Sequence, residues 1–119
     1  MPHCIIEVTK GLLNNISPQD LMEEVSKALN TDKIFVSNDI KLRVREIEHS
    51  FMGEVRQTHS YVSAEIMILD NKTDQQKERL LDKVQNVLVE FFQNRTDKQS
   101  ITCRLTLMQP EYYRRHVKY

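Results

Sequence analysis

The chain has 119 residues, of which 39% are hydrophobic and 29% charged, a composition typical of one folded domain with its own core. The 17 basic and 17 acidic residues cancel, so the overall charge provides no attraction to nucleic acid or to an anionic membrane. No apolar run approaches the roughly 20 residues that span a bilayer, and the N-terminus lacks the layout of a signal peptide.

The chain opens with a predicted strand followed by a predicted helix. Residues 3–9 are rich in β-formers and follow Pro2, which donates no backbone N–H and suits the start of a strand. The stretch SPQDLMEEVSKAL predicts a helix that Ser17 caps, with Pro18 at its first position and its end near Asn30. If the initiator methionine is removed, Pro2 has a second reading, because its nitrogen becomes a secondary amine that can accept a proton.

A second strand is predicted over residues 40–48. Apolar side chains alternate there with Lys41, Arg43 and Arg45, which is the pattern of a half-buried strand with one basic face. Such a basic row is also what an ordinary solvated strand face looks like. We expect residues 49–60 to form a loop or a hairpin connection.

The second half of the chain repeats these signals. Residues 61–69 predict a strand, and Thr73 with Gln76 forms a capping box at the start of a helix. Residues 101–108 predict a final strand. The apolar stripe of the helix is expected to pack in the core and consists of Leu80, Val84, Val87, Leu88 and Phe91.

The order of elements is therefore β-α-β followed by β-α-β, which indicates an internal duplication with halves of about 1–58 and 59–119. IKLRV aligns with ITCRL, so that Arg43 and Arg104 occupy the same position in each half. Right-handed crossovers put both helices on one side of a sheet. We expect a single α/β (α+β) domain with a four-stranded sheet, two helices on one face, and an opposite face that needs a partner subunit.

Cysteine, histidine and glycine usage limits the chemistry. Cys4 and Cys103 belong to no CxxC pair, which favours free thiols in a reducing cytoplasm. The four histidines have no HxH or HxxxH spacing, so the sequence predicts no metal site. With only Gly11 and Gly53, phosphate-binding glycine loops are excluded, and we expect no cofactor.

These features together resemble the tautomerase superfamily, and within it most closely the 5-carboxymethyl-2-hydroxymuconate Δ-isomerases. The start MPHCIIEV is similar to that family's Met-Pro-His-hydrophobic opening, and TDKIFVSNDIKLRV resembles its second-strand segment. ILDNKTDQQKERLLDKV is similar to the strand-turn-helix of the smaller 4-oxalocrotonate tautomerases. The resemblance implies a homotrimer and an isomerase that shifts a proton in an unsaturated keto or hydroxy acid. It also implies that this reaction is one step in the degradation of aromatic compounds.

The resemblance also implies roles for individual residues. Pro2 matches the catalytic N-terminal proline. Lys41, which we assign to catalysis with it, falls where the family usually has an arginine on the second strand that binds the substrate carboxylate. Arg43 and Lys72 match basic positions that bind the substrate carboxylate. Phe51 is expected to supply an apolar wall. Lysine at positions 41 and 72 keeps the charge but loses the planar fork that grips a carboxylate.

Two other functions compete with this one. The two lysines, and an amide nitrogen at Pro2 if Met1 is retained, favour an inactive or weakly active homo-oligomer with the same fold. The tail YYRRHVKY has the basic and aromatic composition that stacks on nucleic-acid bases. Packing of Tyr112, Tyr113 and Tyr119 against a neighbouring subunit is the simpler reading of the tail, and His3 is expected to pack or hydrogen-bond at that interface. We therefore expect a small unsaturated carboxylate as partner, without nucleic acid or membrane.

Overall fold

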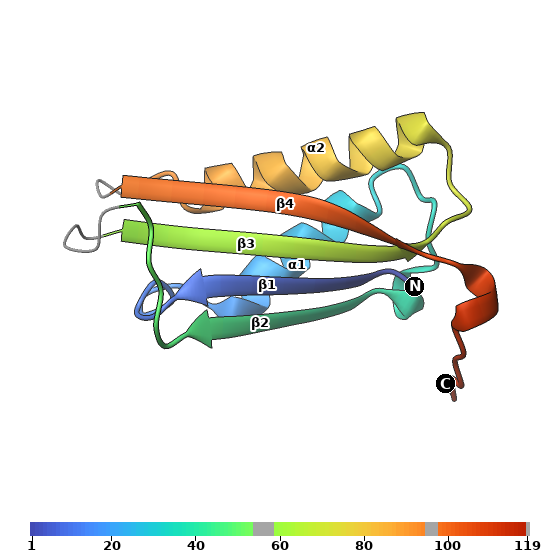
Figure 1. Cartoon of the computed structure of the whole chain (residues 1–119), viewed down its shortest axis with the longest axis horizontal. Coiled ribbons are helices and arrows are strands. Elements are labelled where there is room, and N and C mark those ends of the chain that lie inside the picture. The colour runs from blue at the N-terminus through green and yellow to red at the C-terminus, as the bar shows by residue number, and fades with distance from the viewer. Residues whose placement is uncertain (54–58, 95–97, 119) are drawn as a thin grey trace.

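The computed structural model describes residues 1–53, 59–94 and 98–118 and contains two β-α-β units in series (Figure 1). The first unit comprises β1 (His3–Thr9), α1 (Pro18–Leu29) and β2 (Lys41–Ile47). The second unit comprises β3 (His59–Leu69), α2 (Asp74–Phe91) and β4 (Lys98–Met108). Two short 3₁₀ helices, η1 (Ser37–Asp39) and η2 (Pro110–Tyr112), precede β2 and follow β4.

The predicted order of elements is confirmed, with differences at the strand ends. Strands β3 and β4 begin earlier than the sequence patterns indicated, at His59 and Lys98. The first residues of these strands are polar and pair with each other in the ladder between β3 and β4. Because they are all polar, the sequence shows no alternation of apolar and polar residues there. Of the predicted connection between β2 and β3, residues 54–58 lie outside the described part of the chain.

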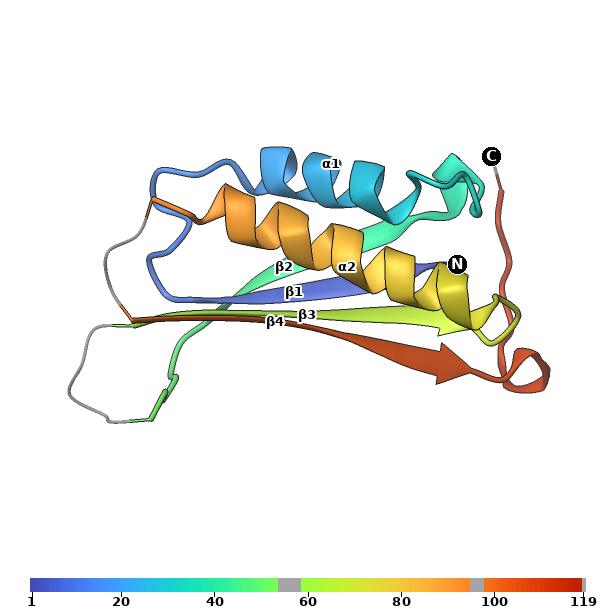
Figure 2. The ribbon, with the colours of Figure 1, turned by 90° about the horizontal axis from the view of Figure 1, so that it is seen from above.

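The four strands form one sheet in the order β2-β1-β3-β4. Within each unit the strands are parallel, whereas β1 and β3 pair antiparallel where the units meet. Figure 2 shows that both helices lie against the same face of the sheet. The expectation of a four-stranded sheet with two helices on one face is therefore confirmed.

The core lies between that face and the helices. Side chains alternate along the inner strands, so that Cys4, Ile6 and Val8 of β1 point toward the helices and are at most 1% exposed. Buried leucines and valines from α1 and α2 pack onto them, namely Leu21, Val25, Leu29, Leu80, Val84 and Leu88. The alternation leaves His3, Ile5 and Glu7 on the opposite, uncovered face.

Both cysteines are free thiols, as the sequence predicts. Burial raises the pKa of the Cys4 thiol to about 12, and Cys103 adds a smaller upward effect. Burial also raises the pKa of the half-buried Cys103 to about 11.

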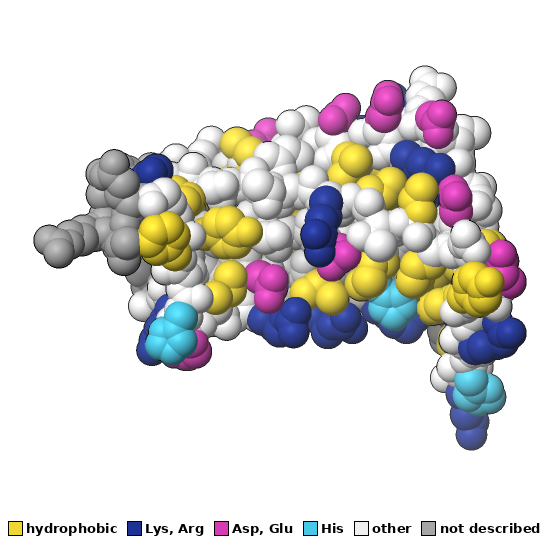
Figure 3. Space-filling view, in the orientation of Figure 1, with side chains coloured by type: hydrophobic (Ala, Val, Ile, Leu, Met, Phe, Trp, Pro, Cys, Tyr) yellow, Lys and Arg dark blue, Asp and Glu magenta, His cyan; other side chains and the backbone are white. Residues whose placement is uncertain are grey.

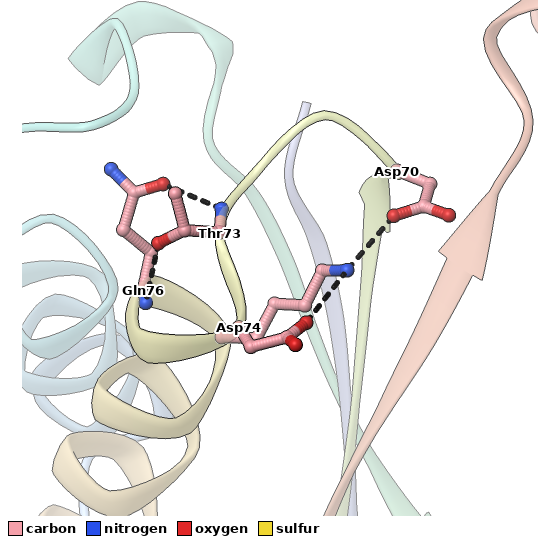
Figure 4. Close-up of polar contacts among 5 residues, drawn as sticks. Asp70, Thr73, Asp74 and Gln76 are labelled. Atoms are coloured by element: carbon pink, nitrogen blue, oxygen red, sulfur yellow. Dashed lines mark hydrogen bonds and ion pairs between the residues drawn. The ribbon is translucent and has the colours of Figure 1, made fainter.

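Both helices start at the predicted caps. The Ser17 hydroxyl accepts a hydrogen bond from the Asp20 amide at 3.2 Å. At α2 the capping box is complete, because the Gln76 amide donates to the Thr73 hydroxyl at 3.1 Å and the Thr73 amide donates to the Gln76 side chain at 2.9 Å (Figure 4). None of the helices within the described ranges is both long and apolar enough to cross a membrane.

We predict that Thr73→Ala lowers the free energy of unfolding by about 1 kcal/mol, since it leaves an amide of the first turn of α2 without its acceptor. Gln75→Ala, an exposed position in the same turn, is the matched control and should change stability much less. Urea denaturation followed by circular dichroism measures both. Equal effects of the two substitutions would contradict a stabilising role of the cap.

Candidate active site at the N-terminal end of the first strand

Pro2 is buried at the head of β1, where the backbone of β2 holds it. The Pro2 carbonyl oxygen accepts a hydrogen bond from the Lys41 amide at 3.0 Å. The next residue pair, His3 and Lys41, begins the parallel register of the two strands. Because the pyrrolidine ring also fixes φ, the Pro2 nitrogen has one defined direction at this end of the sheet.

A cavity of about 180 Å³ lies beside this end of β1. Met1 and Asp39 line it, and the turn before α2 contributes Asn71 and Lys72. That turn reaches the start of β1 because β3, which leads into it, runs antiparallel to β1. Apolar side chains complete the lining, namely Ile34, Phe35, Val36 and Leu69.

The N-terminal amine lies in an environment of mixed charge. Burial lowers the pKa of the Met1 amine, and the cations of Lys41 and Arg115 lower it further. The Asp39 carboxylate acts in the opposite direction. The net effect is a lowered pKa, which favours the neutral, proton-accepting form of an amine at this end of the sheet.

Lys41 and Arg43 extend from β2 on the face that the helices leave uncovered. Lys41 lies opposite His3 in the register and donates from Nζ to the Asp39 carbonyl oxygen at 3.3 Å. Arg43 lies opposite Ile5, one step farther from Pro2 on the same face. Figure 3 shows basic side chains gathered along the β2 edge of this face. The predicted basic row of this strand is therefore present.

Lys72 reaches the same cavity from the other side. Its Nζ donates to the Ile34 carbonyl oxygen at 3.1 Å and lies 5.3 Å from the centre of the Phe35 ring. Pro2, Lys41 and Lys72 thus meet at one end of the sheet, although no spacing in the sequence relates them.

Phe51 is not brought to this end within one chain. It follows the carboxyl end of β2, and β2 runs parallel to β1, so Phe51 and Pro2 belong to opposite ends of the strand pair. Its side chain is 62% exposed. The apolar residues of the cavity are instead those of the η1 loop and the end of β3.

Two charged residues near Pro2, Asp39 and Arg115, were not predicted from the sequence. Arg115 donates from two nitrogens to both carboxylate oxygens of Asp39, at 3.0 and 3.2 Å. The Tyr113 hydroxyl lies 3.3 Å from Nε2 of His3, so the tail contacts its own chain here, and its packing on a neighbouring subunit stays a prediction. Tyr119 lies outside the described residues. These contacts join segments far apart in the sequence, where no local pattern signals them.

His3 lies within the same cluster of positive charges. Burial lowers the pKa of the His3 imidazole, and the nearby positive charges of Lys41, the N-terminal amine and Arg43 lower it further. Within residues 1–53, 59–94 and 98–118, no group of three His, Cys, Asp or Glu side chains could hold a metal ion.

Comparison with known proteins places this chain in a family. The model of the 5-carboxymethyl-2-hydroxymuconate isomerase family matches residues 2–116. The chain belongs to this family. That membership supports an isomerase or tautomerase activity. A search of curated proteins by sequence gave no match.

Solved structures show that the chain has the fold of this isomerase family and of related tautomerases. A 5-carboxymethyl-2-hydroxymuconate isomerase from Deinococcus radiodurans R1 superimposes with a TM-score of 0.86 at 15% identity, covering 98% of this chain and 90% of that one. A 5-carboxymethyl-2-hydroxymuconate delta-isomerase gives a TM-score of 0.80 at 12% identity, with coverages of 99% and 89%. A structure described as the W0 fused 4-OT wild type symmetric trimer gives 0.69 at 18% identity, with coverages of 92% and 88%.

We predict that Lys41→Gln raises the midpoint at which His3 titrates, because it removes the largest positive influence on that imidazole. Arg45→Gln, which removes a cation from the same face of β2 farther from His3, should leave the midpoint nearly unchanged. NMR titration of the His3 ring protons measures both. In the wild-type protein the midpoint should lie below 6.5, the ordinary value of histidine. Equal shifts in the two variants would contradict the placement of Lys41 beside His3.

Proposed function

We propose that this protein is an isomerase that moves a proton between two carbons of an unsaturated keto or hydroxy acid, with Pro2 as the general base once Met1 has been removed. The observation that carries the proposal is the placement of Pro2. Its backbone is held at the head of a buried strand, beside a cavity and among cations. A base that must return its proton to a defined carbon needs such a fixed position.

The chemistry requires a base that is neutral near physiological pH. A prolyl secondary amine is intrinsically more basic than an ordinary N-terminal amine, whose pKa is about 7.7–8.0. Burial and neighbouring cations disfavour its protonated form, and both act on the amine one residue away at Met1. A base whose pKa lies near the working pH is the most effective general acid–base catalyst.

The dienolate that forms when the proton leaves carbon needs positive charge nearby. Lys41 is the cation nearest in the register to the head of β1, and we assign it this stabilising role. Arg43 and Lys72 flank the site from β2 and from the turn before α2, and we assign them to the substrate carboxylate. Arg43 provides the planar fork suited to that group, whereas Lys72 offers a point charge.

Phe51 can act as an apolar wall only if a second copy of the chain supplies it. The uncovered sheet face carries the half-buried apolar side chains of Ile5, Met67 and Leu69. The fused 4-OT structure with the same fold is a symmetric trimer. We propose that this protein also forms a homotrimer through that face, in which Phe51 of one copy reaches the site of another.

We predict that Pro2→Ala lowers kcat/KM for a muconate-type isomerisation by roughly a hundredfold or more but does not abolish it, since a primary amine is a base in a less defined position. Pro18→Ala, at the exposed start of α1, is the control and should retain activity. The protein that retains Met1, identified by intact-mass spectrometry, should be inactive because an amide nitrogen does not accept a proton at neutral pH. Equal turnover by the processed and the Met1-retaining forms would leave Pro2 as a strand-starter only.

For the carboxylate site we predict that Arg43→Ala chiefly raises KM, by about tenfold to a hundredfold, through the loss of a charge-assisted hydrogen bond. Arg45→Ala is the matched control. Arg45 lies on the same face of β2, and its guanidinium Nη2 is 3.4 Å from Oε2 of Glu7, with which it forms an ion pair. Steady-state kinetics with a dicarboxylate competitor separates the two variants. A KM unchanged by Arg43→Ala would remove Arg43 from the site.

The assembly is tested independently of activity. Sedimentation equilibrium at micromolar concentration should give three times the chain mass. Phe51→Ala should then lower the activity of the trimer without changing its mass, because the assigned role of Phe51 is in the site of a neighbouring copy. A stable monomer with full activity would contradict both parts of the proposal.

A second candidate is a homo-oligomer that keeps the fold with little or no catalysis. Lys72 favours it, because the amine already donates to a backbone carbonyl and lies over an aromatic ring, as a structural lysine does. An active wild-type protein that loses activity in Pro2→Ala would decide against this candidate. Nucleic-acid binding by the tail has less support, since Tyr113 and Arg115 both contact residues of their own chain.

A further inference from the structure

The C-terminal tail crosses the end of the molecule where β1 begins (Figure 1). After η2 the chain turns down past the N-terminus, where side chains of the tail contact the domain. Tyr113 contacts His3, and the guanidinium of Arg115 lies against both oxygens of Asp39. A two-pronged contact of this kind fixes the carboxylate in position as well as in charge.

Asp39 is an unusual neighbour for an amine that must act as a base. It is only 8% exposed, at the end of η1, and lines the same cavity as Met1. A carboxylate at this place stabilises the protonated form of the amine, and it opposes burial and the cations in doing so. Left alone, Asp39 would work against the chemistry proposed for Pro2.

The groups around the amine come from every element that meets at this end. Asp39 comes from η1, Lys41 from β2, Arg115 from the tail and Lys72 from the turn before α2, while His3 follows in β1 itself. Asp39 is the acidic member of this set. Arg115 engages its carboxylate, whereas Lys41 donates to the Asp39 backbone carbonyl.

We propose that Arg115 is a positioning residue of the active site: it holds and neutralises the Asp39 carboxylate, so that the amine at the head of β1 stays available as a base near neutral pH. This inference rests on the proposed function of Pro2. An arginine suits the task because it stays charged at all relevant pH values and matches both carboxylate oxygens. The tail thereby contributes to a site that lies 113 residues earlier in the sequence (115 − 2).

The alternative is that Arg115 only fastens the tail to the domain. The two roles differ in what they change. A fastening contact affects stability and leaves the titration of the amine alone, whereas a neutralising contact moves that titration even where stability is unaffected. Tyr113→Phe serves as the control for fastening, because it removes the hydroxyl contact with His3 without changing any charge.

The experiment follows the Pro2 nitrogen directly. Protein labelled with ¹⁵N-proline is produced with co-expressed methionine aminopeptidase, and the loss of Met1 is verified by intact mass. Of its three prolines, only Pro2 then has a titrating nitrogen, because Pro18 and Pro110 nitrogens are amides. NMR titration gives the midpoint for the amine without any need for turnover.

Arg115→Gln should raise this midpoint by about one pH unit, since the carboxylate then acts on the amine without the guanidinium charge of Arg115 beside it. Arg115→Lys should restore most of the wild-type value, and Tyr113→Phe should leave it unchanged. Asp39→Asn should lower the midpoint, and the double variant Asp39→Asn with Arg115→Gln should return it close to wild type. Should Arg115→Gln prove unfolded by circular dichroism, the Asp39→Asn and double variants give the same comparison.

An unchanged midpoint in Arg115→Gln, or equal midpoints in Asp39→Asn and the double variant, would overturn the inference. The acid limb of the kcat/KM profile should move with the midpoint. If the midpoint moves as expected while Pro2→Ala leaves activity intact, the electrostatic role of Arg115 stands and the proposed function of Pro2 fails.

Discussion

The antiparallel pairing of β1 with β3 is the constraint on which the rest of the structure depends. It joins two β-α-β units into one sheet and places two buried strands at its centre. It also brings the start of β1 to the end of β3. Pro2 and Lys72 belong to separate units, and without this junction the cavity beside Met1 would lose the part of its lining that Leu69, Asn71 and Lys72 supply.

Much of the fold could be predicted from sequence because its signals are local. Ser17 and Thr73 act as caps through bonds that span only three residues. The alternation of residues 40–48 depends only on the pleat of a single strand. The pairing between the units is different in kind, because the register of β1 against β3 is set by packing across the whole sheet, and no short stretch of sequence encodes it.

The site divides along the same line. Pro2 and Lys41 could be named in advance because the opening residues and the second-strand segment resemble those of the isomerase family. Both residues lie in the first β-α-β unit, where a backbone hydrogen bond joins them. Asp39 and Arg115 could not be named in this way. An aspartate before a strand and an arginine in a basic tail are both ordinary on their own, and they become informative only when the fold brings them within 3.0 Å. Phe51 is the opposite case. It was predicted for the site from the sequence, yet within one chain it lies at the other end of the strand pair.

The buried thiols have a consequence for the compounds this protein is proposed to handle. An unsaturated ketone is an electrophile, and the usual protein group that such compounds alkylate is a cysteine thiolate. With pKa values raised to about 12 and about 11, Cys4 and Cys103 stay in the unreactive thiol form at pH 7. Their surroundings therefore make these two thiols poor targets for the compounds proposed as substrates. At the start of β1, the nucleophile that such a compound meets is the nitrogen proposed as the general base.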